Sequence, residues 1–162
     1  RLARELGQDA VVVQRMRTAG LLHDIGKVAI PQSLLNKPGR LTAEEFAKLM
    51  THPVVGWEIC KPLRTAQSVL DCILYHHERF DGSGYPEGLA GEKIPYQARL
   101  LAVADALDAL TSERAYRRSL SVDEAVELLG QETDAGKWDP DIYAALTRLA
   151  ERGQADPRRL EL

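Results

Sequence analysis

Apolar residues recur at helical spacing along most of the chain, and no segment shows the strict apolar–polar alternation of a half-buried β-strand. Residues 1–6 have the pattern of a helix already in progress, and Gly7 ends it. Asp9 can cap the next helix. The apolar face of that helix is formed, at steps of four, three and four, by Val12, Met16, Ala19 and His23. This spacing predicts an all-α fold in which His23 lies on a buried helical face.

Capping residues mark where later helices begin. Two capping boxes, in which a Thr or Ser precedes a Glu by three positions, predict helices over 43–50 and 122–129. Asp139 precedes a proline and predicts a last helix that ends near residues 152–153. We expect His52 to stand at the end of the 43–50 helix.

A glycine- and proline-rich loop separates two further helices. An apolar stripe that begins near residue 66 continues to His76 and His77, which places both imidazoles near the core. Residues 80–95 contain four glycines and two prolines, too many for the interior of a helix. They therefore form a loop, and a loop of this length usually has a function.

The helix after this loop carries two acidic residues. Its stretch from 98 to 110 is apolar on nearly every face except at Asp105 and Asp108. An ionised carboxylate in such surroundings must be paired or must coordinate a cation. For Asp105 the alternatives are a metal ion and a salt bridge to an arginine.

Length and composition place the chain among single-domain globular proteins. Its 162 residues suffice for one core, 44% of them are hydrophobic and 28% charged, and no apolar run approaches the ~20 residues that cross a bilayer. The formal charge of −3 argues against the broad basic face that polymeric nucleic acid requires. A small anionic ligand needs only local positive charge and stays open.

The two cysteines point to a reducing compartment. Cys60 and Cys72 stand in apolar surroundings, which favours buried free thiols over a disulfide framework or a zinc knuckle. The chain also opens on a helical pattern instead of a signal sequence. We expect a cytoplasmic segment cut from a larger protein.

All four histidines fall where a metal site would use them. His23 is followed by Asp24, His52 stands near a helix end, and His76 and His77 are adjacent. Neutral imidazole is the commonest transition-metal ligand, and carboxylate oxygen is its usual companion. The pattern predicts a polynuclear nitrogen and oxygen site. Hydrogen-bonded core histidines are the alternative.

A series of short motifs runs in a fixed order along almost the whole chain. They are His23-Asp24-Ile25-Gly26-Lys27, Ile30-Pro31, Lys37-Pro38-Gly39, Leu41-Thr42 with Glu45, His52-Pro53 with Gly56, His76-His77-Glu78-Arg79, Asp81-Gly82-Ser83-Gly84-Tyr85-Pro86, Ile94-Pro95, Ala102-Val103-Ala104-Asp105, Asp108-Ala109-Leu110-Thr111, and Arg114 with Tyr116 and Arg117. In this order they resemble the HD-GYP domains, a branch of the HD-domain phosphohydrolases.

The resemblance implies a compact all-helical HD-domain bundle, a single domain over 1–162, whose loop carries the Gly-Tyr-Pro motif. It implies hydrolysis of the bacterial second messenger cyclic di-GMP to linear pGpG, GMP or both, with two or sometimes three iron or manganese ions. The implied metal ligands are His23, Asp24, His52, His76, His77 and Asp105. Asp24 would bridge two ions, one held with His52, His76 and His77 and the other with His23 and Asp105.

Four residues have implied roles in the reaction. The ions would activate a water to attack phosphorus, with Asp24 between them. Lys27 lies one helical turn from His23 and could hold its ammonium against the phosphate, or it could be a surface lysine. Arg114 and Arg117 are three apart, so their guanidinium groups could bind phosphate or guanine. A solvated charge pair is the alternative for these arginines.

One departure from the family concerns the first helix, where the family has a further histidine before the segment that resembles residues 2–4. We therefore expect a domain truncated within its first helix, whose His23 and Asp105 site is weaker than its His52, His76 and His77 site. The truncation supports a second reading, a catalytically impaired module for cyclic di-GMP binding or protein docking. The ligand and basic positions that are present all match the active pattern, however, which favours catalysis. Hydrolysis of another nucleotide is a third reading, which the Gly-Tyr-Pro motif disfavours.

The family also implies partners. Its loop is associated with docking to diguanylate cyclase domains, although the loop over 80–95 could equally act as a lid. An upstream regulatory domain and a homodimer are further expectations. Glu78 and Asp108 could orient the histidines, because a metal-bound imidazole usually donates its other proton to an acceptor.

Overall fold

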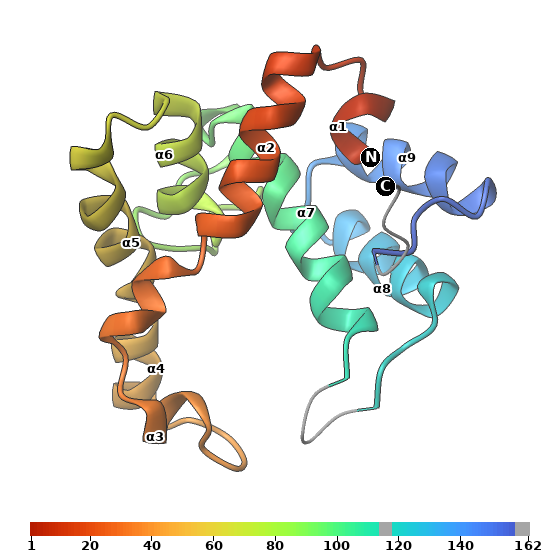
Figure 1. The fold of residues 1–162 in the computed structure, drawn as a ribbon. Coiled ribbons are helices and arrows are strands. Elements are labelled where there is room, and N and C mark those ends of the chain that lie inside the picture. Colours follow the sequence, from red (N-terminus) through yellow and green to blue (C-terminus); the bar gives the residue numbers. More distant parts are fainter. Residues whose placement is uncertain (114–117, 158–162) are drawn as a thin grey trace.

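The computed structural model describes residues 1–113 and 118–157, and within these ranges it contains helices and no strand, which confirms the all-α prediction (Figure 1). Three short segments, labelled η, are 3₁₀ helices. In chain order the elements are α1 (Leu2–Glu5), α2 (Ala10–Leu22), η1 (Ile25–Ala29), α3 (Gln32–Leu35), α4 (Ala43–Leu49), α5 (His52–Cys60), η2 (Lys61–Leu63), α6 (Gln67–Tyr75), η3 (Gly91–Lys93), α7 (Tyr96–Thr111), α8 (Val122–Asp134) and α9 (Pro140–Glu151).

Helix α7 stands between two groups of helices and contributes to the core of each (Figure 1). On one side, Leu100 and Leu107 pack with the apolar faces of α1, α8 and α9. On the other side, Leu101 packs with residues of α2, α5 and α6. Two opposite faces of α7 are therefore buried, which explains why its sequence is apolar nearly all round. The arrangement brings α7 beside the ends of α2 and α6, where the predicted ligands lie.

The predicted caps are confirmed. Thr42 and Ser121 each accept a hydrogen bond from the backbone of the glutamate three positions on, and both capping boxes are complete. Asp139 accepts from the backbone N–H groups at the start of α9. Asp9 accepts from Val12 N in the same way at the start of α2. These caps satisfy donors that would otherwise have no partner.

His52 does not end the helix over 43–50 as predicted. The chain turns at residues 50–51, and His52 is the first residue of α5. Pro53 lies in the first turn of α5, where its missing N–H costs no helical hydrogen bond. The sequence pattern also missed η1 and α3. These segments have only five and four residues, which is too short for a periodic apolar stripe to be recognised.

Two predictions about burial have opposite outcomes. Cys60 and Cys72 are buried free thiols, as predicted. Asp108 is exposed on α7, so its carboxylate does not need the partner that the sequence suggested, whereas Asp105 is partly buried. In the described part of the chain, no helix combines the length and the apolar character needed to cross a bilayer.

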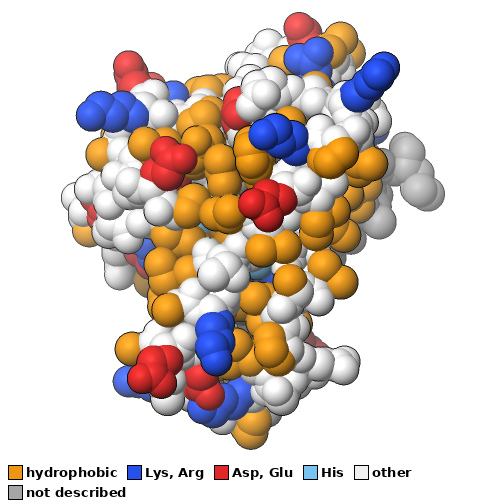
Figure 2. Space-filling view, turned by 90° about the vertical axis from the view of Figure 1, so that its left-hand side faces the viewer, with side chains coloured by type: hydrophobic (Ala, Val, Ile, Leu, Met, Phe, Trp, Pro, Cys, Tyr) orange, Lys and Arg blue, Asp and Glu red, His pale blue; other side chains and the backbone are white. Residues whose placement is uncertain are grey.

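The face that carries α5 and α6 displays many hydrophobic side chains (Figure 2). Among the exposed large apolar residues, Val54 and Ile59 belong to α5 and Leu63 belongs to η2. At the other end of the fold, α1 packs against α9, and the first and last described residues lie close together (Figure 1). The predicted ligands lie between these two regions.

Candidate metal centre

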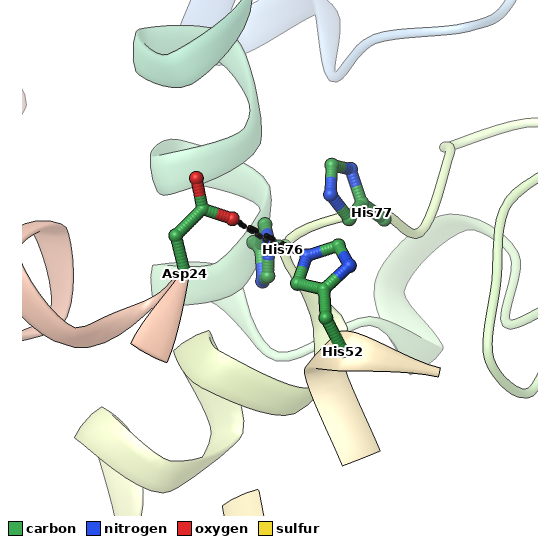
Figure 3. A group of neighbouring side chains, drawn as sticks. All are labelled: Asp24, His52, His76 and His77. Carbon is green, nitrogen blue, oxygen red and sulfur yellow. Dashed lines mark hydrogen bonds and ion pairs between the residues drawn. The ribbon is translucent and has the colours of Figure 1, made fainter. Parts of the chain in front are cut away.

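Four of the predicted ligands form one cluster, drawn in Figure 3: Asp24, His52, His76 and His77. Each offers one ligand atom, and these atoms all lie within 4.8 Å of one another. Asp24 precedes η1, His52 begins α5, and the two adjacent histidines follow α6. Three segments that are far apart in the sequence therefore deliver nitrogen and oxygen atoms to one point.

Glycines make this approach possible. Gly26 in η1 lies so close to α5 that a Cβ atom there would overlap the carbonyl oxygen of His52 and lie 2.6 Å from Gly56 N. Gly56 faces η1 in turn, where its own Cβ would lie 3.2 Å from Gly26 N. Because neither residue has a side chain, η1 packs directly on the backbone of α5. This contact brings Asp24 next to His52.

Three of the histidines are held in the same way. Nδ1 of His23 lies 2.8 Å from the carbonyl oxygen of Gly20, Nδ1 of His52 lies 2.8 Å from that of Leu49, and Nδ1 of His76 lies 2.9 Å from the carbonyl oxygen three positions before it. A carbonyl oxygen can only accept, so Nδ1 donates in each case. In the neutral ring, Nε2 then carries a lone pair and faces the cluster, which is the arrangement that metal-binding histidines use.

The resulting geometry suits a divalent cation. Nε2 of His52 lies 3.4 Å from Nε2 of His76 and 3.3 Å from Oδ1 of Asp24. In the neutral rings these atoms present lone pairs to one another. Oδ1 of Asp24 is buried and accepts no hydrogen bond within the described residues. A buried acceptor without a donor is costly, and a cation placed among these atoms would satisfy all of them.

The other two predicted ligands lie on the opposite side of Asp24. Nε2 of His23 is 3.4 Å from Oδ2 of Asp24 and 3.6 Å from Oδ1 of Asp105, which projects from α7. Asp24 thus presents one oxygen to His52 and the other to His23. Nζ of Lys27 also lies 2.5 Å from Oδ2 of Asp24. The predicted bridging position of Asp24 is compatible with this arrangement.

The electrostatics keep the carboxylates ionised and the paired histidines neutral. Burial alone would raise the pKa of Asp24, but its contacts with His52 and Lys27 hold that pKa well below the ordinary value. Burial, followed by the charge of neighbouring imidazoles, lowers the pKa of His76 to about 4 and that of His77 to about 2. Near neutral pH these two imidazoles are therefore unprotonated and free to act as ligands.

His23 behaves differently. Burial alone would lower its pKa, but the hydrogen bond to Asp105 and the charge of Asp24 raise it above the ordinary value. The pKa of Asp105 is lowered in turn, because its contact with His23 outweighs the effect of burial. The two carboxylates therefore favour positive charge at Nε2 of His23, as they would favour a cation in the same place.

The sequence did not predict the position of Tyr85. This residue of the Gly-Tyr-Pro motif stacks its ring on His77, with ring centroids 4.8 Å apart and an angle of 28° between the planes. Its backbone N–H donates to the carbonyl oxygen of His77 at 3.3 Å. The glycines around Tyr85 signalled a tight turn, but they did not indicate which residue the turn would meet.

Two residues that could have orienting roles, Glu78 and Asp108, have no hydrogen bond to a histidine ring within the described residues. Glu78 is 2% exposed, and its carboxylate accepts hydrogen bonds from the backbone N–H groups of Glu87, Gly88 and Leu89 instead. Asp108 is exposed on α7. Arg114 and Arg117, the predicted substrate-binding residues, lie outside the described residues.

Comparisons with known proteins identify the family of the chain. The family model of the HD domain matches residues 1–142. A relative from Pseudomonas aeruginosa, named cyclic di-GMP phosphodiesterase PA4108, is 43% identical over 148 residues, which are 91% of this chain and 35% of the relative. A relative from Vibrio cholerae, named 3'3'-cGAMP-specific phosphodiesterase 1, is 34% identical over 151 residues, which are 93% of this chain and 35% of the relative.

A solved structure has the same fold. It is described as Bd1817, an HDG"Y"P protein from Bdellovibrio bacteriovorus, and it matches with a TM-score of 0.74 and 26% identity, over 93% of this chain and 48% of that one. The chain thus spans only about a third to a half of the lengths of these proteins. Together with the clustered histidines and aspartates, these matches show that the chain belongs to the HD domain family, in its HD-GYP branch.

Proposed function

We propose that the chain is the catalytic domain of a metal-dependent phosphodiesterase that hydrolyses cyclic di-GMP to pGpG, GMP or both. The observation that carries this proposal is the close approach of Nε2 of His52 to Nε2 of His76 and to Oδ1 of Asp24, a buried oxygen that accepts no hydrogen bond within the described residues. The relative named as a cyclic di-GMP phosphodiesterase, which is 43% identical, supports the choice of substrate.

The donor set indicates which ions the site would hold. Imidazole nitrogen and carboxylate oxygen without thiolate suit iron or manganese. One ion would be held by Asp24, His52, His76 and His77, and a second by Asp24 with the pair on its other side, His23 and Asp105. When bound, such ions supply an activated water and neutralise charge on the phosphate.

Lys27 adds a positive charge at the same place. Its side chain is 38% exposed, and its ammonium donates to Oδ2 of Asp24 at 2.5 Å. The ammonium therefore lies at the solvent-accessible side of the centre, where an incoming phosphate would need a counter-charge. We propose that Lys27 binds a phosphate oxygen of the substrate while Asp24 stays ionised, and that Arg114 and Arg117 bind the rest of the dinucleotide.

A second substrate has specific support. The relative from Vibrio cholerae acts on 3'3'-cGAMP according to its name, and it is 34% identical to this chain over 151 residues. The two cyclic dinucleotides share their phosphate chemistry and differ in one base. The metal centre does not distinguish them, so the choice of base belongs to residues that contact the bases.

Location and assembly belong to the same proposal. Two buried free thiols support a reducing cytoplasm. The hydrophobic face that carries α5 and α6 supports a homodimer or another protein partner (Figure 2). Exposed loop residues such as Asp81 and Ser83 could dock a diguanylate cyclase domain, and an upstream regulatory domain would control the activity.

The test is hydrolysis by the 162-residue chain after anaerobic loading with Fe(II) or Mn(II). Cyclic di-GMP and 3'3'-cGAMP are supplied separately and in competition, and products are separated by chromatography. We expect cyclic di-GMP to be cleaved, and we expect His76→Ala to abolish cleavage. Preferential cleavage of 3'3'-cGAMP would replace the substrate, and binding without cleavage of either would support a docking module instead.

A further inference from the structure

We propose that Tyr85 is the positioning residue of His77, and that Glu78 holds the loop which presents Tyr85 to it. This inference rests on the proposed metal centre. This role of the tyrosine in the Gly-Tyr-Pro motif differs from a lid or a docking surface, because the ring stacks on His77, a proposed metal-binding side chain, and not on a partner protein.

His77 is held differently from the other three histidines. The rings of His23, His52 and His76 each donate a hydrogen bond to a backbone carbonyl oxygen. The ring of His77 has no hydrogen bond within the described residues, and it contacts other rings instead. Its centroid lies 4.1 Å from that of His76, 4.9 Å from that of His52 and 4.8 Å from that of Tyr85. Ring contacts therefore fix its orientation.

Of these three contacting rings, Tyr85 is the one that is not a histidine of the cluster. Its ring is nearly parallel to that of His77, with 28° between the planes, so it covers one face of the imidazole. The stacked ring resists rotation of the His77 imidazole about its side-chain torsions. In the other three histidines, the hydrogen bond from Nδ1 has this role. Phe46 of α4 meets the Tyr85 ring edge to face at 6.3 Å and supports it from another element.

Glu78 fixes the loop on the far side of Tyr85. One of its oxygens accepts from Glu87 N at 2.8 Å and Gly88 N at 3.1 Å, and the other accepts from Leu89 N at 3.0 Å. The carboxylate is buried, so these charge-assisted bonds have no competition from water. Three consecutive backbone groups are thereby tied to the residue that directly follows His77.

Gly84 fixes the near side. A Cβ atom at this position would lie 2.5 Å from the carbonyl oxygen of His77 and would also overlap the backbone of Glu78 and Arg79. The loop backbone therefore lies directly on the backbone of the histidine pair. With Gly84 in contact before it and residues 87–89 bonded after it, the Tyr85 ring has little freedom to leave His77.

The experiment measures Mn(II) affinity by the electron paramagnetic resonance signal of free Mn(II), together with the absorption spectrum of the Co(II)-loaded chain. Tyr85→Leu should weaken the affinity roughly tenfold, the loss typical of groups that orient a metal ligand, and should alter the Co(II) spectrum. Tyr85→Phe keeps the stacked ring and should retain wild-type values. Tyr143→Leu, the same change on α9, is the matched control and should lower thermal stability alone.

Two further variants test the route of the effect. Glu78→Gln offers one acceptor oxygen and turns an amide donor toward the loop N–H groups, so it should weaken Mn(II) binding as Tyr85→Leu does. In a His77→Ala background, Tyr85→Leu should have no additional effect on affinity, because its target is gone.

The outcomes separate this inference from the proposed function. Unchanged affinity and an unchanged Co(II) spectrum in Tyr85→Leu, with normal metal binding and hydrolysis by the wild-type chain, would overturn the role of Tyr85 alone. Equal losses in Tyr85→Phe and Tyr85→Leu would also overturn it, because the hydroxyl and not the ring would be responsible. A wild-type chain that binds no Mn(II) would instead overturn the metal centre and this inference together.

Discussion

His52 and His76 face each other with their Nε2 atoms 3.4 Å apart, although both rings have already donated Nδ1–H to a backbone carbonyl oxygen. Both imidazoles are almost fully buried, at 1% and 0% exposure. In the neutral rings, two Nε2 lone pairs cannot hydrogen-bond to each other. A cation between them would interact favourably with both, and the unfolded chain does not bring the two atoms together.

Metal binding should accordingly stabilise the fold. At a free Mn(II) concentration 100-fold above the dissociation constant, mass action adds about 2.7 kcal/mol to the free energy of unfolding. For a domain of this size that corresponds to a rise of roughly 5–10 °C in Tm. Thermal unfolding followed by circular dichroism checks this, with EDTA as the reversal. An identical Tm with and without metal in wild type and His76→Ala would contradict it.

The proposed bridging position of Asp24 predicts how many ions each variant keeps. Asp24→Ala should lose both ions, because one oxygen faces His52 and the other faces His23. Asp105→Ala should lose one ion and keep the one among Asp24, His52, His76 and His77. Ions per chain are counted by elemental analysis after gel filtration. Equal losses in the two variants would argue against a bridge.

Gly26 should tolerate no side chain. In Gly26→Ala the new Cβ overlaps the backbone of His52, so we expect a loss of about 2 kcal/mol or more in the free energy of unfolding. The matched control is Gly20→Ala in α2, where a Cβ would meet nothing within 4 Å. This control should be more stable than wild type by about 0.5–1 kcal/mol, because alanine favours the helix. Chemical denaturation measures both, and equal stabilities would refute the close packing of η1 on α5.

Lys27 should affect turnover more than metal content. Lys27→Met removes the ammonium beside Asp24 and should lower kcat by about 10²-fold or more, as loss of a charge-stabilising group does. Ions per chain should stay unchanged, since lysine is not among the ligands. Lys48→Met, an exposed lysine on α4, serves as the control. A loss confined to metal content would mean that Lys27 acts through Asp24 and not on the phosphate.

The buried thiol of Cys72 should make the free energy of unfolding fall as the pH rises above 9. Burial, with a smaller effect of Asp71, raises the pKa of this thiol from 9.0 to about 12. Below pH 9 both states keep the proton and the stability is fully present. Between pH 9 and pH 12 the unfolded state releases the proton and the folded state retains it, so the free energy of unfolding falls by about 1.4 kcal/mol per pH unit from this group.

Cys72→Ala isolates that effect from other groups that titrate in the same range. The variant lacks the thiol, so its free energy of unfolding should fall less steeply above pH 9 than that of the wild type. Urea denaturation at several pH values between 8 and 11 provides the comparison. Parallel curves for the two proteins would show that the thiol is not shielded in the folded state.

Local sequence determined the helices with clear caps and the chemistry of the ligands. The starts of three helices can be predicted from their capping residues, Thr42, Ser121 and Asp139, because a capping hydrogen bond depends only on residues within three positions. The histidines and aspartates of the site are likewise read directly from the chain, and their order indicates the family. These features do not depend on how the helices pack.

Tertiary structure decided the contacts between segments. The start of α5 at His52 was missed because the preceding apolar pattern runs on without a strong break, and packing against η1 settles the boundary. The exposure of Asp108 and the partial burial of Asp105 depend on which sides of α7 meet other helices. When a helix is apolar on nearly every face, its sequence does not show which of its polar residues will be buried until the packing is known.

The side chains that could bind a metal can be identified from the sequence, because ligand chemistry depends on the residue type. The hold of Glu78 on the loop backbone and the stacking of Tyr85 on His77 become visible once the chain is folded. These contacts depend on the backbone approach that Gly84 allows, between segments that are separated by a turn. Hydrophobic periodicity and caps report on helices, whereas the orientation of a ligand is set by neighbours that folding brings together.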